Sequence, residues 1–250
     1  MEKMVVEFCH MQALETTRLK ALIFDVDGTL YRQRWVRYGM VWRLLYASAG
    51  QPTQSLRTFR VLRAYRRAQE VLRTSRSEVG DIAERQRQLT CEWTGVAPEF
   101  VDACVTRWME QAPLALVASS RRAGVAEFLG TARRRGLRLG ICSDYPPTAK
   151  LRALRLAHFF EVVVSAQDPE VQQFKPHPRG LETTLQRLGV DKEQALYIGD
   201  RPEVDAVAAW RAGIACVIIG RAPEKQHGGW AQVRNYRALQ HTLWPTEAAR

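Results

Sequence analysis

The sequence predicts an α/β protein with a doubly wound parallel sheet and a block of helices inserted after the first strand. Two observations support this fold class. From residue 119 onward, short and almost entirely apolar segments alternate with helical segments, as in parallel sheets covered on both faces. Another apolar segment, residues 19–24, precedes a long stretch that contains no convincing strand. The sheet therefore begins near the N-terminus and resumes only after that stretch.

The elements of the sheet follow one another in a regular order. The strands expected after the first one are 137–142, 161–165, 195–198 and 214–219. The helices expected around them are 121–135, 148–156, 178–188 and 203–212. Gly136, Gly189 and Gly213 directly follow three of these helices. Glycine often ends a helix because it accepts a left-handed backbone conformation, so these positions support the predicted helix ends.

The segment 31–118 breaks the alternation. Its helical spacing covers residues 38–49, 55–73, 79–93 and 98–111. We expect a separate helical cap over residues 31–118, and a core made of residues 19–30 and 119–222. Residues 1–18 are expected to form an N-terminal tail, and residues 223–250 a C-terminal extension of unassigned structure.

Composition and charge limit the classes of function. The chain has 250 residues, of which 46% are hydrophobic and 25% charged, as in ordinary soluble proteins. It has no apolar run near the ~20 residues of a membrane span, and its N-terminus lacks the apolar region of a signal peptide. Five cysteines without a CxxC pair indicate a reducing cytoplasm rather than disulfides or structural zinc. The net charge of +11 indicates an anionic partner or a bias towards arginine.

Polar side chains follow the predicted strands at the ends where ligands bind in open α/β sheets. They are acids, a hydroxyl and a lysine: Asp25, Asp27, Ser143, Asp144, Lys175, Asp200 and Asp205. Clustered carboxylates repel one another unless a hard cation neutralises them, and Mg²⁺ is the usual cation beside carboxylate and phosphate oxygens. A groove for nucleic acid would instead need an excess of Lys and Arg there. Asp25 and Asp27 alone would also fit a solvated turn.

The arrangement suits phosphoryl transfer. Asp25 can attack phosphorus as a carboxylate nucleophile, which forms an aspartyl-phosphate. Asp27 can protonate the leaving alcohol and later activate water. Ser143, Lys175 and the backbone around Gly28 and Thr29 can hold phosphate oxygens, because glycine lets N–H groups approach an anion closely. Asp144 is expected beside the phosphate as well.

Together these motifs resemble the haloacid dehalogenase (HAD) superfamily of phosphohydrolases over residues 19–220, and most closely its phosphoglycolate-phosphatase-like members. The DxDGT motif is residues 25–29, the hydroxyl of the second motif is Ser143, the lysine of the third is Lys175, and the fourth joins Gly199 and Asp200 to Asp205. The resemblance implies a Rossmann-like core with a helical cap inserted after the first motif.

The resemblance also implies roles for the acids. Asp25 would be the nucleophile and a ligand of Mg²⁺. Asp27 would be the general acid and base, with its backbone carbonyl on the metal. Asp200 would bind the metal directly, and Asp205 would support it from the second layer. The expected reaction is hydrolysis of a small phosphomonoester.

Two alternatives stay open. A phosphosugar mutase keeps both aspartates of the first motif, whereas dehalogenases of the superfamily lack an acid at the position of Asp27. A non-catalytic protein that binds nucleic acid or another anion on the same scaffold is the second alternative, and nucleic acid is not the expected partner. The substrate and the oligomeric state are not predicted.

The arginines of the cap allow two interpretations, and its tryptophans are expected to be structural. The arginines either form a solvated helix face or select a substrate with additional negative charge. They are Arg32, Arg34, Arg37, Arg60, Arg63, Arg66, Arg67, Arg73 and Arg76. Trp35, Trp42 and Trp108 are expected to pack within the cap and its hinge.

Overall fold

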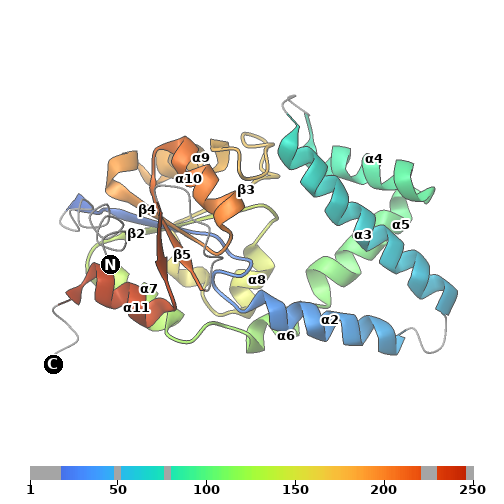
Figure 1. Cartoon of the computed structure of the whole chain (residues 1–250), viewed down its shortest axis with the longest axis horizontal. Coiled ribbons are helices and arrows are strands. Elements are labelled where there is room, and N and C mark those ends of the chain that lie inside the picture. Colours follow the sequence, from blue (N-terminus) through green and yellow to red (C-terminus); the bar gives the residue numbers. More distant parts are fainter. Residues whose placement is uncertain (1–17, 48–51, 76–79, 221–229, 246–250) are drawn as a thin grey trace, which may run out of the picture.

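The protein contains one sheet of parallel strands in the order β3–β2–β1–β4–β5–β6 (Figure 1). The computed structural model describes residues 18–47, 52–75, 80–220 and 230–245. The strands are β1 (Ala21–Phe24), β2 (Arg138–Ser143), β3 (Val162–Ser165), β4 (Ala195–Gly199), β5 (Ala215–Ile219) and β6 (Trp230–Val233). The predicted doubly wound α/β class is confirmed.

Strand β1 lies at the centre of the sheet, between β2 and β4. All its residues are buried, which is why the segment is continuously apolar. Phe24 is level with Ile141 of β2 and Ile198 of β4. The three strands therefore end at nearly the same height, and the polar residues that follow them emerge at one edge.

Helices cover both faces of the sheet. They are α7 (Val125–Arg134), α8 (Thr148–Ala153), α9 (Arg179–Leu188), α10 (Val207–Ala212) and α11 (Tyr236–Leu243). Leu22 and Phe24 pack into the cluster that includes α7, α8 and α11 residues, whereas Ala21 and Ile23 face the cluster of α9 and α10. A short π-helical segment, Pro202–Ala206, precedes α10. The alternation along β1 thus divides the core into two layers.

The segment between β1 and β2 is helical, and it extends away from the sheet (Figure 1). It contains α2 (Gln33–Ala47), α3 (Pro52–Thr74), α4 (Ile82–Thr94), α5 (Pro98–Val105), a π-helical segment (Thr106–Gln111) and α6 (Leu114–Ser119). Helices α3, α4 and α5 share a small apolar cluster around Val61 and Val101. A second cluster, around Ala68 and Ile82, also includes Ala166 and Phe174 and therefore joins these helices to the segment after β3. The bounds of cap and core stay a prediction.

The tail beyond residue 222 contributes to the core. Strand β6 pairs with β5, and α11 packs beside α7. Tyr236 is fully buried, its ring is tilted by 47° against that of Phe128, and its hydroxyl donates to the carbonyl oxygen of Thr29 at 3.1 Å. The sequence analysis treats residues 223–250 as an extension, but its described part, 230–245, completes the sheet and supports the turn after β1.

The exposure of the cap tryptophans differs from the expectation. Trp35 and Trp42 do not pack within the cap, because both side chains are exposed on α2, whereas Trp108 is half-buried. The expected packing role is therefore wrong for the first two. Among the described residues, no helix is both long and apolar enough to cross a membrane. The expected tail of residues 1–18 lies outside the described residues except for Arg18.

Substituting Tyr236→Phe tests the support that α11 gives to the turn after β1. Removing the hydroxyl leaves the buried carbonyl of Thr29 without this donor, so we expect the free energy of unfolding to fall by about 1–2 kcal/mol in urea titrations. Tyr46→Phe, at a fully solvent-facing tyrosine on α2, is the matched control and should change stability by less than about 0.5 kcal/mol. Equal effects of the two substitutions would contradict the assignment.

Candidate active site

Three predicted acids meet at the carboxyl edge of the sheet. Asp25 follows β1, and Asp200 and Asp205 follow β4. One carboxylate oxygen from each lies within 4.8 Å of the others. Asp25 and Asp205 are buried. The sequence prediction that these carboxylates converge therefore agrees with the geometry.

Lys175 lies between two of these acids. Its ammonium donates to Oδ1 of Asp25 at 2.6 Å and to Oδ1 of Asp205 at 2.7 Å. It also contacts the hydroxyl of Tyr197 at 3.0 Å. Burial lowers the pKa of Lys175, but the carboxylates of Asp205 and Asp25 outweigh burial and raise that pKa well above its ordinary value. The lysine therefore remains a buried cation shared by two carboxylates.

Asp205 is fully engaged by protein donors. Its Oδ1 accepts from Lys175 and from the hydroxyl of Tyr197, and its Oδ2 accepts the backbone N–H groups of Asp200 and Arg201 at 3.1 and 3.0 Å. Burial raises the pKa of Asp205, but Lys175 and these hydrogen bonds lower it below its ordinary value. Asp205 therefore orients Lys175 and the backbone at Asp200, and its oxygens are already occupied. This favours the supporting role expected from the resemblance.

Asp200 has the opposite environment. Its Oδ1 is buried and has no hydrogen-bond partner among the residues that the structure describes. A Cβ atom at position 28 would lie only 1.9 Å from Oδ2 of Asp200, and Gly28 has a φ of +96°. Only glycine lets the turn after β1 approach Asp200 this closely. Gly28 thus brings the first and fourth motifs together.

The charge balance of this edge favours a cation. Burial is the main cause that raises the pKa of Asp25 to about 7 and that of Asp200 to about 8, and neighbouring carboxylates raise both further, against the opposing effect of Lys175. Oδ2 of Asp25 accepts only from the Thr29 hydroxyl, at 3.2 Å, among the described residues. Two oxygen donors with spare capacity suit a hard divalent ion such as Mg²⁺. Asp25 and Asp200 would hold it.

Asp27 has partners that the sequence analysis does not identify. Its two oxygens lie 2.6 and 2.7 Å from the ammonium of Lys150, which is on α8, and the hydroxyl of Tyr31 donates to Oδ1. Burial raises the pKa of Asp27, but Lys150 and Tyr31 lower it below its ordinary value. Asp27 is therefore held as a carboxylate. Lys150 lies in the first turn of the helix after the Ser143 strand, but this setting does not distinguish it from other helical lysines in the sequence.

Ser143 and Asp144 end β2 and begin the following loop. The Ser143 side chain is buried, and within the described part of the chain its hydroxyl makes no hydrogen bond, which leaves it available to a ligand. The Asp144 carboxylate binds Arg73 at 2.6 Å and accepts the backbone N–H of Lys175 at 3.1 Å. Because the Asp144 carboxylate is already bound to Arg73 and to the backbone of Lys175, it cannot bind a phosphate oxygen. Any contact of Asp144 with phosphate has to come from its backbone N–H.

The arginines of the cap separate into two groups. Arg60, Arg63, Arg66 and Arg67 are exposed on α3, and Arg76 lies outside the described residues. Arg73 instead reaches the core, where it also donates to the carbonyl oxygen of Lys175 at 2.5 Å. Arg66 is two helical turns before Arg73 and therefore on the same side of α3.

Arg66 lies within electrostatic reach of the proposed acid and base. Burial lowers the pKa of Arg66, Arg37 of α2 lowers it further, and Tyr145, Asp27 and Tyr31 oppose this. Arg37 likewise acts on Tyr31. Two cations of the cap therefore approach the Asp27 side of the site.

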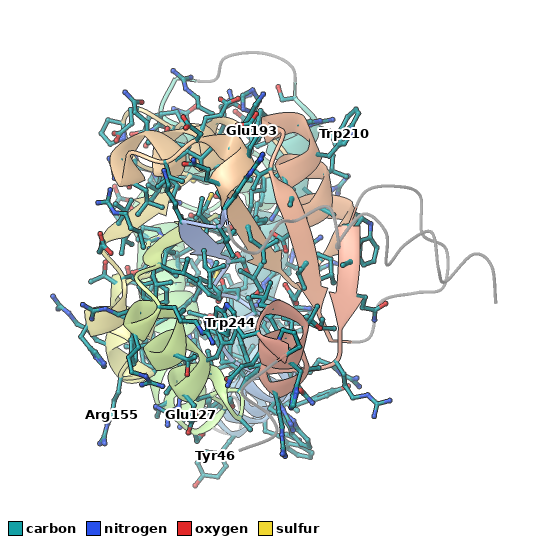
Figure 2. The ribbon with its side chains drawn as sticks, turned by 90° about the vertical axis from the view of Figure 1, so that its left-hand side faces the viewer. Tyr46, Glu127, Arg155, Glu193, Trp210 and Trp244 are labelled. Carbon is teal, nitrogen blue, oxygen red and sulfur yellow. The ribbon has the colours of Figure 1, made fainter. Side chains whose placement is uncertain are left out.

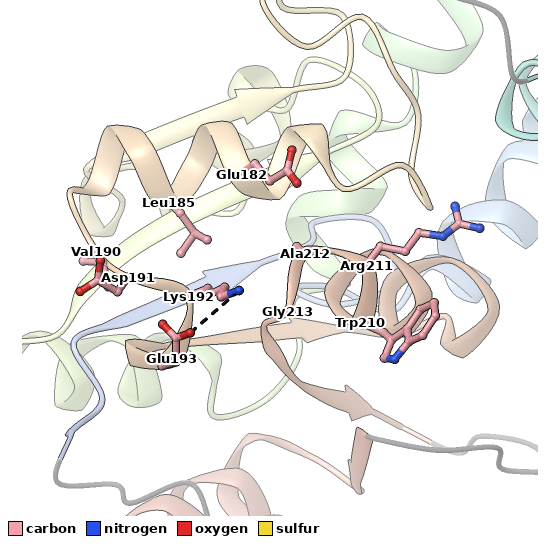
Figure 3. A pocket seen from close by; sticks show the side chains of 10 residues that line it. All are labelled: Glu182, Leu185, Val190, Asp191, Lys192, Glu193, Trp210, Arg211, Ala212 and Gly213. Carbon is pink, nitrogen blue, oxygen red and sulfur yellow. Dashed lines mark ion pairs between the residues drawn. The ribbon is translucent and has the colours of Figure 1, made fainter.

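A pocket of about 600 Å³ lies elsewhere, between α9 and α10 (Figure 3). Its lining includes Leu185, Trp210 and the ion pair of Lys192 with Glu193. None of the site residues predicted from the sequence lines it. This pocket is therefore separate from the acid cluster.

Known proteins similar to this chain agree with the motifs. A family model described as haloacid dehalogenase-like hydrolase matches residues 19–213. A phosphoglycolate phosphatase of Rhodospirillum rubrum is 34% identical over 135 residues, which are 51% of this chain and 55% of that protein. A glyceraldehyde 3-phosphate phosphatase of Methanopyrus kandleri is 31% identical over 210 residues, 81% of this chain and 84% of that protein. The match thus spans about half the length of the first relative and most of the second.

A solved structure shows the same fold. The 2-haloacid dehalogenase of Pseudomonas syringae pv. Tomato matches with a TM-score of 0.63 at 21% identity, and the match covers 90% of this chain and 98% of that one. At this identity the likeness concerns the fold, not the reaction.

The raised pKa values of Asp25 and Asp200 predict how stability depends on pH and metal. Both folded-state pKa values, about 7 and about 8, lie above the ordinary value of 3.8. At pH values between the ordinary and the raised pKa, the folded protein therefore binds more protons than the unfolded chain. In EDTA, the melting temperature should therefore fall as the pH rises from about 5 to about 9. Millimolar Mg²⁺ should reverse this fall, most strongly at high pH.

Asp200→Asn should flatten the pH dependence and remove the shift caused by Mg²⁺, because it replaces one ionisable ligand with a neutral amide. Glu193→Gln, at an exposed acid, is the control and should behave as wild type. A Mg²⁺ shift that survives Asp200→Asn would place the cation elsewhere.

Proposed function

Because this chain belongs to the haloacid dehalogenase-like hydrolase family, we propose that it is a magnesium-dependent phosphatase that hydrolyses a small phosphomonoester through an aspartyl-phosphate on Asp25. The observation that carries the proposal is the pair of acids after β1, of which Asp25 is held by Lys175 and Asp27 by Lys150 and Tyr31. The names of the two phosphatase relatives support the reaction class.

Asp25 is oriented for attack. Lys175 binds its Oδ1 and the Thr29 hydroxyl binds its Oδ2, which fixes the plane of the carboxylate, so that one oxygen would attack phosphorus while the other faces the metal. Ser143 and Lys175 would bind oxygens of the phosphoryl group, and developing negative charge there is stabilised by such fixed donors. A bound Mg²⁺ would supply Lewis-acid stabilisation of the same oxygens and allow Asp25 to lose its proton. The P–O bond to the alcohol breaks as the bond to Asp25 forms.

Asp27 would handle the protons of both half-reactions. It would donate a proton to the leaving alcohol, and it would then accept one from the water that attacks the aspartyl-phosphate. The Lys150 ammonium stabilises the carboxylate form, so that contact has to weaken before Asp27 can carry a proton. Lys150 is therefore a positioning residue in this proposal, and Tyr31 is a second one.

The substrate is expected to carry a second anionic group. Arg37 and Arg66 both lie within electrostatic reach of Tyr31, on the Asp27 side of the site. Arginine is suited to carboxylate and phosphate groups because its planar donors bind two oxygens at once. A phosphorylated carboxylic acid or a bisphosphate would use both cations.

The two aspartates can be separated with p-nitrophenyl phosphate, whose leaving group needs no proton. Asp27→Asn should still form the aspartyl-phosphate and release about one equivalent of nitrophenolate in a burst, with the steady rate reduced by roughly 10²–10⁴-fold. Asp25→Asn should give neither a burst nor turnover. Stopped-flow absorbance measures both phases.

Phosphate release from natural substrates decides the reaction class. Inorganic phosphate released with turnover by wild type supports a hydrolase. Isomerised sugar phosphate without phosphate release would contradict it and favour a mutase. Inactivity of wild type across a broad panel of phosphorylated metabolites would contradict both reactions.

Arg66→Ala tests the second anionic group. For a phosphorylated carboxylate such as phosphoglycolate, we expect KM to rise roughly tenfold, since one charge-assisted hydrogen bond is lost. For p-nitrophenyl phosphate, which has no second anion, KM should change by less than about twofold. Arg63→Ala, one turn earlier on α3 and exposed like Arg66, is the control for both substrates. Equal changes with the two substrates would remove Arg66 from substrate selection.

A further inference from the structure

Helix α2 exposes a broad apolar face. Its members, which we name the α2 outer face, are Trp35 (64% exposed), Tyr38 (57%), Val41 (54%), Trp42 (73%), Leu45 (56%) and Tyr46 (87%). They recur at helical spacing and therefore form one continuous stripe along the helix. Figure 2 shows Tyr46 pointing away from the rest of the protein. Large side chains exposed in such a group indicate an interaction surface rather than scattered surface residues.

The opposite side of the same helix is already in use. Val36 and Met40 pack against the main core cluster, and Gly39 lies close to Leu116 of α6. A helix that is apolar on both sides is normally covered on both. The start of α3, which touches α2, also exposes Leu56 and Phe59. Two helices of the cap therefore expose large apolar side chains.

The charge of these helices restricts the partner. Between them, α2 and α3 carry nine arginines and one glutamate. Arg34 lies within the α2 outer face, Arg37 borders one side of it, and Arg43 borders the other. A second copy of the chain would bring like charges together across a symmetric interface, so self-association is disfavoured. The partner has to combine an apolar layer with negative charge.

An anionic bilayer has both properties. Tryptophan and tyrosine favour the boundary between headgroups and acyl chains, where a polar atom can stay hydrated while the ring is buried. Arginines beside them can pair with lipid phosphates. Nucleic acid would use the arginines and the rings, but it offers nothing to the aliphatic side chains of Val41, Leu45 and Leu56. An apolar face with flanking cations and no acids is the pattern of interfacial helices.

We propose that the α2 outer face, with the start of α3, docks onto the surface of an anionic lipid membrane. The apolar side chains enter the headgroup region, and the neighbouring arginines other than Arg37, which is assigned to the substrate, bind lipid phosphates. The helix lies along the surface and does not cross it. Because α2 begins at Gln33, close behind Tyr31 and Asp27, docking would hold the proposed active site near the membrane.

Vesicle co-sedimentation of the full chain tests the proposal. Wild type should bind vesicles of equimolar phosphatidylcholine and phosphatidylglycerol, bind pure phosphatidylcholine at least tenfold more weakly, and lose most binding in about 0.5 M NaCl. The double variant Trp35→Ser with Trp42→Ser should bind the anionic vesicles at least tenfold more weakly than wild type. Trp210→Ser is the matched control, because Trp210 is 74% exposed on α10 of the core, and it should bind as wild type. Circular dichroism and melting curves verify that both variants are folded.

Four results would overturn the proposal. The first is no binding of wild type to anionic vesicles at low salt. The second is equal binding of the double variant and wild type to these vesicles. The third is a dimer in light scattering that the double variant disrupts. The fourth is a DNA duplex that binds through the same tryptophans while vesicles do not bind. Neither arm of the experiment depends on catalysis, so failure of the proposed phosphatase activity would leave the result readable.

Discussion

The buried ammonium of Lys175 is the interaction on which the carboxyl edge of the sheet depends. It joins Asp25, which follows the central strand, to Asp205, which follows β4, and it does so where water cannot screen their repulsion. One cation cannot neutralise the whole cluster, because Asp200 also points into it with an unpartnered oxygen. The remaining negative charge makes the site a natural acceptor for a divalent ion and for the phosphate that accompanies it. The proposed chemistry therefore follows from an incomplete charge balance.

The cap is tied to this charge centre. Arg73 of α3 binds the Asp144 carboxylate and the backbone carbonyl of Lys175, so a cap helix contacts the peptide that carries the central lysine. Tyr145 lies beside this contact, where it stacks on Tyr65 of the cap and packs near Phe174 of the core. The loop after β2 thus joins strand β2, helix α3 of the cap and the segment that carries Phe174 and Lys175. A movement of α3 would therefore displace the residues that position Lys175.

The sequence predicts the parts of the molecule where one strong constraint acts on neighbouring residues. Strand β1 is recognisable because both of its faces are buried, and the acids after it because parallel strands end at one edge. The partners Lys150 and Tyr31 of Asp27 are not recognisable in the same way, since a lysine in a helix and a tyrosine after a turn have many other uses. Strand β6 is short, at the sheet edge and only partly apolar, so its segment resembles a loop. The exposure of Trp35 and Trp42 could not be predicted, because a tryptophan-rich helix usually signals packing.

The hydrogen bond from Tyr236 to Thr29 has a consequence for the order in which the protein is made. The two residues are 207 positions apart in the sequence. The second, Tyr236, belongs to α11, which packs beside α7. During synthesis the turn with Asp25 and Asp27 leaves the ribosome early, but its backing hydroxyl follows only after about 200 further residues, some ten seconds or more later at ordinary elongation rates. A nascent chain would therefore contain every residue of the reaction centre before it holds them in their final arrangement. Competence to act on phosphate esters would therefore arise only after Tyr236 and strand β6 have been made.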